Sequence, residues 1–257
     1  MNSLSSFQVE KGNALFLILI AVALFAALSY AVTNSGRGGG GVDRETASIQ
    51  AAELVQYAGQ IRSAIMRLQL IGGCSDTNIS FESPETGTLL QNTSDPASGN
   101  ECHVFHSDGG GVSYMSIADD MLDGANSGSK YYGQPIFVGT TRIQGVGTYN
   151  GTGGRELLMT VPFVSAELCT ELARQTVGLN SDGSIPQDNN IAYNVSESSN
   201  SYFTGEYTTP GGFELYGRGS STPTVGTHFI GSETGCFEGN NLPPTGTYHF
   251  YHVLIAR

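Results

Sequence analysis

The longest run of apolar positions lies near the N-terminus, over Asn13–Val32. From Ala14 onward this run carries no charged residue, and its polar interruptions are Ser29 and the Tyr30 hydroxyl. As a helix rising about 1.5 Å per residue it would reach roughly 28 Å, close to the thickness of a bilayer's hydrocarbon core. The pattern therefore predicts a transmembrane helix over residues 13–33.

A glycine-rich stretch follows, with five glycines among the six residues Gly36–Gly41. Because glycine costs about 1 kcal/mol relative to alanine inside a helix, residues 34–42 are expected to form a hinge. Helical periodicity resumes over residues 43–71, with Asp43 as the expected N-cap and Gly72-Gly73 after the end. Apolar positions recur along one side of this second helix: Ala51, Leu54, Ala58, Ile61, Ile65 and Leu68. Such a stripe needs a partner, most simply the chain's own sheet; coiled-coil pairing between chains is the alternative, which the short run and the alanines disfavour.

Beyond Cys74 the pattern changes to short strands. We expect a hairpin over Cys102–His106 and Val112–Met115, and further strands over Ile136–Ile143, Glu156–Val164, Gly212–Tyr216, Thr227–Ile230 and Thr247–Ala256. One more helix is expected over Ser165–Val177, capped by Ser165 and ended by Gly178. The predicted fold class is α+β: a long N-terminal helix, half membrane-spanning and half amphipathic, packed on a mainly antiparallel β-sheet, with one further short helix.

The charge is distributed unevenly along the 257 residues, whose formal net charge is −12. Residues 1–71 contain four acidic and five basic residues, which leaves residues 72–257 with a net charge of −13. A domain this acidic repels nucleic-acid phosphates, so we expect no nucleic-acid partner. Its acidity mainly predicts solubility.

The cysteines indicate the compartment. There are four, Cys74, Cys102, Cys169 and Cys236, and none forms a CxxC pair. An even count behind an apolar N-terminal segment fits two disulfides formed in an oxidising compartment, within a β-rich exported domain over residues 72–257. Three pairings are possible, and buried free thiols are the alternative. We favour Cys74–Cys102 and Cys169–Cys236, because each closes a loop within one half of the domain.

Residue patterns that carry catalytic or metal chemistry are not evident. The sequence contains no GxSxG elbow, HExxH helix or phosphate-binding glycine loop. His103 and His106 would point to opposite faces of a strand, which disfavours a metal site there. The carboxylates Asp119, Asp120 and Asp123 lack the alternate-residue spacing of an EF-hand, as do Asp182 and Asp188, and are expected in solvated turns. We therefore predict no enzyme activity, no catalytic residue, no metal and no cofactor.

The leader, junction, long helix and C-terminal sheet together resemble the type IV pilin and type II secretion pseudopilin superfamily. In that family a prepilin peptidase cuts after a glycine that follows a basic residue, and the new N-terminus is methylated. Lys11-Gly12 followed by Asn13 matches this arrangement. The resemblance implies a leader peptide over residues 1–12, cleavage after Gly12 and N-methylation of Asn13. The helices over 13–33 and 43–71 resemble the two halves of the family's long first helix.

Two positions depart from the family pattern. The first mature residue is usually aromatic or Met, and the fifth is usually Glu; here they are Asn13 and Leu17. The family Glu is thought to pair with the N-terminal amine of a neighbouring subunit during assembly. Some minor, tip-located subunits lack it, so Leu17 is compatible with a minor, pilin-like subunit, and the sequence leaves major and minor subunits both open.

The resemblance implies a structural subunit of a bacterial surface filament or secretion pseudopilus. Its partners would be the inner membrane, prepilin peptidase and other pilin-like subunits, contacted through the N-terminal helix. It would reside in the inner membrane before assembly, with its domain in the periplasm, and in an extracellular filament afterwards. The alternative is a single-pass, membrane-anchored extracytoplasmic binding module, with the glycine run as a tether.

Overall fold

The computed structural model of the chain describes residues 13–35, 39–86, 90–94, 99–147, 154–188, 202–207, 213–215, 228–240 and 243–257. The chain divides into two compact units, Met1–Glu45 and Thr46–Arg257. The first unit contains α1, Asn13–Ser35, which is rich in the strong helix formers Leu and Ala. The side chains described in α1 are those of residues 16–30.

The second helix, α2, spans Gly39–Leu70 and is longer than the sequence predicts. Its start at Gly39 shows that the prediction of Asp43 as N-cap is wrong, because Asp43 lies inside the helix. A cost of about 1 kcal/mol per glycine does not outweigh the helix propensity of the residues that follow. The predicted hinge over 34–42 falls partly on residues 36–38, which lie outside the described residues.

Among the described residues, the second unit contains a six-stranded sheet in the order β3-β5-β6-β2-β1-β4. The four inner strands, β5, β6, β2 and β1, pair antiparallel, and the short edge strands β3 and β4 pair parallel. Their bounds are β1 Ile136–Ile143, β2 Glu156–Pro162, β3 Gln187–Asp188, β4 Phe213–Leu215, β5 Thr234–Gly239 and β6 Tyr248–Ile255. The predicted α+β class with a mainly antiparallel sheet is confirmed.

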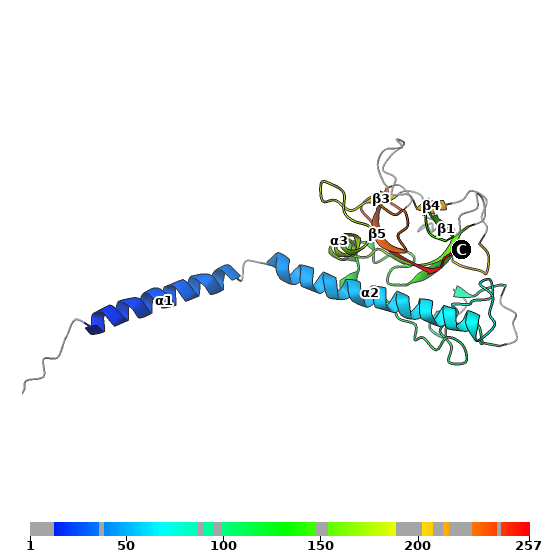
Figure 1. Ribbon diagram of the computed structural model, residues 1–257, viewed down its shortest axis with the longest axis horizontal. Helices are drawn as coiled ribbons and strands as arrows, with labels where there is room; N and C mark the ends of the chain where they lie inside the picture. The colour runs from blue at the N-terminus through cyan, green and yellow to red at the C-terminus, as the bar shows by residue number, and fades with distance from the viewer. Residues whose placement is uncertain are drawn as a thin grey trace, which may run out of the picture. The chain divides into compact units, whose positions relative to one another are not determined.

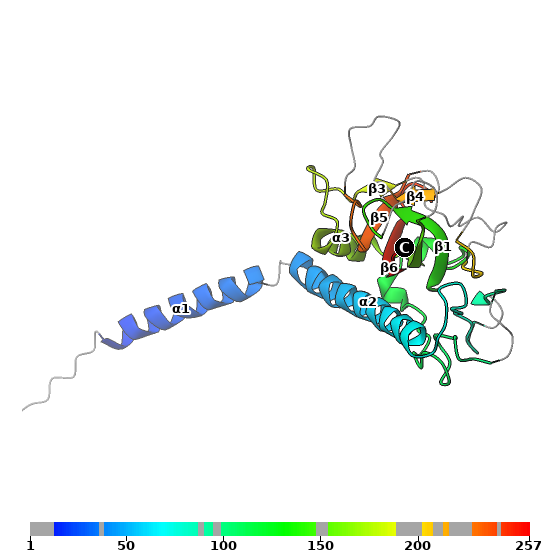
Figure 2. The same cartoon turned by 45° about the vertical axis from the view of Figure 1, so that its right-hand side comes forward.

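The sheet is buried on both faces, as the alternation of side chains along its central strands dictates. Leu157, Met159 and Val161 of β2 lie in one core cluster together with the apolar stripe of α2. Leu158 lies in a second cluster on the opposite face, with Phe237 and Tyr251. The predicted stripe is buried throughout, at 4% exposure or less: Ala51, Leu54, Ala58, Ile61, Ile65 and Leu68. From Thr46 onward α2 thus packs on the chain's own sheet, along one side of it in both views (Figures 1 and 2).

The helix α3, Ala166–Gln175, lies beside β5 and β6 (Figure 2). Its N-terminus is capped as predicted: the Ser165 side chain accepts a hydrogen bond from the Leu168 N–H at 3.3 Å. Glu167 lies in the first turn, where the helix dipole favours negative charge. Two 3₁₀ turns, Asp119–Met121 and Gly124–Asn126, precede β1.

Two predicted strand regions are wrong. The expected hairpin over Cys102–Met115 is a series of turns and an extended segment, in which His103 forms an isolated bridge with Ser80. Within Thr227–Ile230, the described residues 228–230 form a turn. The strand lies further along, at Thr234–Gly239, and two of its six residues are glycine, which weakens the strand pattern in the sequence.

Candidate functional site

The most conspicuous feature of the first unit is the apolar surface of α1. All its described large hydrophobic side chains are exposed, from 40% for Ile20 to 73% for Phe25. The ten residues are Phe16, Leu17, Ile18, Leu19, Ile20, Val22, Leu24, Phe25, Leu28 and Tyr30. A helix that is hydrophobic on every side is stable only when lipid or other protein covers it. This surface therefore needs a partner outside the unit.

Residues 16–30 contain no Asp, Glu, Lys or Arg. Leu17 is one of the exposed apolar side chains, at 59% exposure. This stretch of α1 can therefore associate through apolar contact but not through an ion pair.

The predicted processing residues lie at the boundary of what the structure describes. Gly12 is outside the described residues, and Asn13 is the first residue of α1, with its side chain outside the described set. Cleavage and methylation at this junction remain predictions.

Within the described residues, no helix has both the length and the apolar character required to cross a membrane. The predicted segment over residues 13–33 lies partly outside the described side chains.

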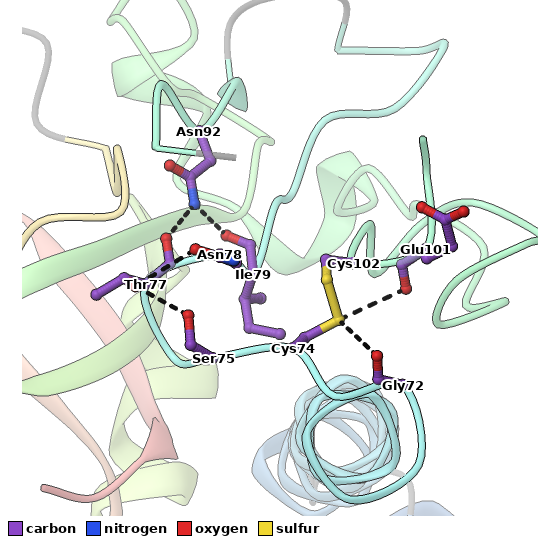
Figure 3. The surroundings of a disulfide bond; sticks show 9 residues. All are labelled: Gly72, Cys74, Ser75, Thr77, Asn78, Ile79, Asn92, Glu101 and Cys102. Carbon is purple, nitrogen blue, oxygen red and sulfur yellow. Dashed lines mark hydrogen bonds between the residues drawn. A yellow bond between two sulfur atoms is a disulfide. The ribbon is translucent and has the colours of Figure 1, made fainter. Parts of the chain in front are cut away.

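The first disulfide joins Cys74 to Cys102, with 5.8 Å between the two Cα atoms. It lies directly after α2, where the Cys74 N–H donates to the Leu68 carbonyl at 3.2 Å and ends the helix. The carbonyl oxygens of Gly72 and Glu101 flank the Cys74 sulfur at 3.9 and 3.8 Å (Figure 3). The bond attaches the end of α2 to the following loop.

Asn92 also holds the loop that follows Cys74, through hydrogen bonds to its main chain. Its side-chain amide is buried and donates to the carbonyls of Thr77 and Ile79, both at 2.7 Å (Figure 3). Its side-chain oxygen accepts from the Ser94 N–H at 2.8 Å. Asn92 therefore has a structural role that the sequence pattern does not reveal.

The second disulfide joins Cys169 of α3 to Cys236 of β5, with 5.3 Å between Cα atoms. Both residues are fully buried, so the bond fastens α3 to the sheet from within the core. All four cysteines are thus paired, and the predicted pairing is confirmed. Two disulfides indicate folding in an oxidising, extracytoplasmic compartment.

The candidate polar residues are dispersed. The rings of His103 and His106 are 6.5 Å apart, centroid to centroid, and His106 Nε2 lies 3.1 Å from the Asn100 amide. Asp123 accepts from the Ala125 N–H and the Asn126 amide, as a capping residue does. Asp120 accepts from Gln50 at 3.2 Å. The structure brings no three metal-ligating side chains together among the residues it describes.

Two histidines of β6 are held neutral. His249 is completely buried against Phe237, and burial lowers its pKa to about 3. His252 is nearly buried, and burial together with the Arg62 charge lowers its pKa to about 4. Their Nε2 and Nδ1 atoms pair with the Thr247 and Thr234 hydroxyls at 2.7 and 2.6 Å respectively. Neither imidazole takes up a proton near neutral pH.

Glu156, at the start of β2, is a fully buried carboxyl that belongs to no sequence motif. Its Oε2 accepts from the Ile143 N–H at 2.8 Å, and its Oε1 has no hydrogen-bond partner among the described residues. Burial raises its pKa to about 7, opposed by the hydrogen bond from Ile143. The sequence feature that could have indicated this buried carboxyl is its position as the single acidic residue of the otherwise mostly apolar strand ELLMTVP.

No known protein family, curated protein or solved structure matches this chain. The fold itself is an α+β arrangement in which an N-terminal helix packs on a mostly antiparallel, disulfide-bonded domain.

Proposed function

We propose that this chain is a pilin-like structural subunit of a bacterial surface filament or secretion pseudopilus, processed by prepilin peptidase after Gly12. The observation that carries the proposal is the exposed apolar surface of α1, on a helix that begins directly after the Lys11-Gly12 junction. The buried stripe of α2 adds support, because it leaves α2 occupied by its own domain and α1 free to associate.

The energetics of α1 give this subunit two states. Exposing ten large apolar side chains to water costs on the order of 20 kcal/mol, at about 1.5–3 kcal/mol each. Before assembly the inner membrane covers them, with the acidic domain on the periplasmic side. During assembly the helices of neighbouring subunits replace lipid, so the apolar surface stays out of water throughout.

Leu17 is the residue on which we base the proposed position of this subunit in the filament. Without a carboxylate at this position the helix cannot form the ion pair that would fix each added subunit to the last. A subunit of this kind joins the filament through apolar contact alone, which fits a minor, terminal position. Its expected stoichiometry is a few copies per filament.

The competing proposal is a membrane-anchored extracytoplasmic binding module that is never processed. Expression with and without prepilin peptidase separates the two. A pilin-like subunit becomes shorter by the 12-residue leader and appears in sheared surface fractions only when the peptidase is present. An anchored module keeps its size and its membrane location in both strains, and that result would exclude the filament proposal.

A further inference from the structure

A groove runs between α2 and the segment Gly110–Met115, with a volume of about 1030 Å³. On one side lie the α2 residues Gln56, Gln60 and Ser63; on the other lies the extended segment. All of these residues belong to the unit Thr46–Arg257, so the groove exists whatever the role of α1.

Two α2 side chains hold the segment alongside the helix. The Tyr57 hydroxyl accepts from the Met115 N–H at 3.0 Å and lies 3.5 Å from the Ser113 carbonyl, to which it donates. Arg67 donates to the Gly110 carbonyl at the other end. These contacts hold the segment against α2 near both of its ends.

Both sides of the groove offer unused hydrogen-bonding groups. Within the described residues, the N–H groups of Ser113 and Tyr114 and the carbonyl of Met115 have no partner. On the opposite side the exposed amides of Gln56 and Gln60 make no hydrogen bond within the same described part. A peptide in extended conformation fits these groups, because main-chain N–H donors and C=O acceptors lie along both of its edges and can pair with both sides of the groove.

The dimensions suit a short extended peptide. From Gln56 to Arg67 the helix rises about 16 Å, the length of about five residues in an extended strand. Near the middle, Gly59 leaves open space, since a Cβ added there meets no atom within 4 Å. The half-buried side chains Val112 and Met115 give the groove apolar contact surface.

The charge of the groove differs from that of its surroundings. Arg67 is the one charged residue among those described as lining it, within a domain whose net charge over residues 72–257 is −13. Arg67 thus offers a positive charge at one end of the groove, and a carboxylate is the group that complements it. We propose that this groove binds an extended peptide segment of about five residues that carries a carboxylate at the Arg67 end.

The test uses the full chain in detergent micelles and fluorescence anisotropy. The probes are two amidated pentapeptides of alternating Val and Thr, with Asp at either the first or the last position, each labelled at the opposite end. Controls replace Asp by Lys or N-methylate the central amides. We expect one Asp probe to bind, and both its Lys and N-methyl forms to bind at least tenfold more weakly.

The variants locate the binding. Gly59→Leu fills the groove and should weaken the Asp probe at least tenfold, whereas Ala52→Leu, which adds the same side chain at an exposed α2 position outside the groove, should change it less than twofold. Arg67→Gln should remove the preference for Asp over Lys. Circular dichroism confirms that each variant is folded.

Three results would overturn the proposal. One is no binding of either Asp probe up to about 1 mM, the weakest affinity of interest. Another is equal binding by the Gly59→Leu and unmodified chains. The third is self-association, seen by sedimentation, that Gly59→Leu abolishes while no probe binds, because the occupant would then be a second copy of the chain.

Discussion

The guanidinium of Arg62 on α2 donates to the carboxylate of Glu233, which precedes β5 and lies 171 residues further along the chain. Both side chains are partly exposed, at 30% and 44%. The hydrogen bond from Arg62 lowers the pKa of Glu233. The pair joins the long helix to the sheet at a point where their apolar surfaces already meet.

Removing this ion pair should cost little. We expect Glu233→Gln to lower the free energy of unfolding by less than about 1 kcal/mol at neutral pH, and by less still in high salt, since partly exposed pairs are weak and screened. Because the folded pKa of Glu233 is lowered, its stabilising effect is present above the unfolded pKa and is lost as pH falls through the folded value. Urea unfolding at two salt concentrations measures this. The control is Glu53→Gln, at an exposed position on α2, the helix that carries Arg62. It should cause no salt-dependent change in the free energy of unfolding.

The two disulfides should contribute unequally. Cys169–Cys236 closes a loop of 67 residues and Cys74–Cys102 a loop of 28. The loss of chain entropy in the unfolded state gives stabilisations of about 4.4 and 3.6 kcal/mol respectively. Replacing Cys169 and Cys236 together by Ser should therefore destabilise more than replacing Cys74 and Cys102, and the loss of buried contact around Cys169 increases the difference. Thermal unfolding of the two double variants compares them. A larger loss for the Cys74–Cys102 pair would show that the loop-entropy argument does not apply here.

Two glycines, one inside α2 and one just after it, provide a matched pair of substitutions. A Cβ added at Gly59 or at Gly73 meets no atom within 4 Å, but Gly73 has φ of +67° whereas Gly59 lies within the helix. Gly59→Ala should stabilise by about 0.5–1 kcal/mol through helix propensity. Gly73→Ala should destabilise by about 1–2 kcal/mol, because a Cβ strains the left-handed conformation. Denaturant midpoints give both values; stabilisation by both substitutions would refute the conformational argument.

The sequence predicts this fold where periodicity is strong and uninterrupted. The stripe from Ala51 to Leu68 and the strand Ile136–Ile143 match the structure because one buried face imposes a regular spacing. The strand Thr234–Gly239 was missed because its glycines resemble a turn, although pairing with β6 and the Cys169–Cys236 bond stabilise it. Of the candidate site, the cysteine pairing followed from the order of the four cysteines, because each bond closes a loop within one half of the domain. The groove beside Tyr57 did not, because it depends on contacts between residues 43 positions or more apart.

Glu156 should make stability depend on pH in the direction opposite to most carboxyls. Its folded pKa of about 7 lies well above the ordinary value for a glutamate, so its protonated form is favoured by folding. The stability it contributes is complete below the unfolded pKa and is lost as pH rises through about 7. We expect Glu156→Gln to be more stable than the unmodified chain at pH 8, by on the order of a few kcal/mol, and about equal near pH 4.

The difference between Glu156→Gln and the unmodified chain isolates Glu156. The lowered pKa values of His249 and His252 change stability with pH in the opposite direction, but they do so in both chains and cancel in the difference. Unfolding free energies measured at several pH values test it. A constant difference across the range would mean that Glu156 is not the group responsible.

The mature N-terminus tests the assembly proposal most directly. The protein is purified from a bacterium that has an active prepilin peptidase, and its N-terminal peptide is identified by mass spectrometry. We expect the chain to begin at Asn13 with a methylated amine. An intact Met1, or a start after Ala31, would contradict the proposal, because α1 would then be an ordinary anchor or a removed signal rather than the assembly helix of a pilin-like subunit.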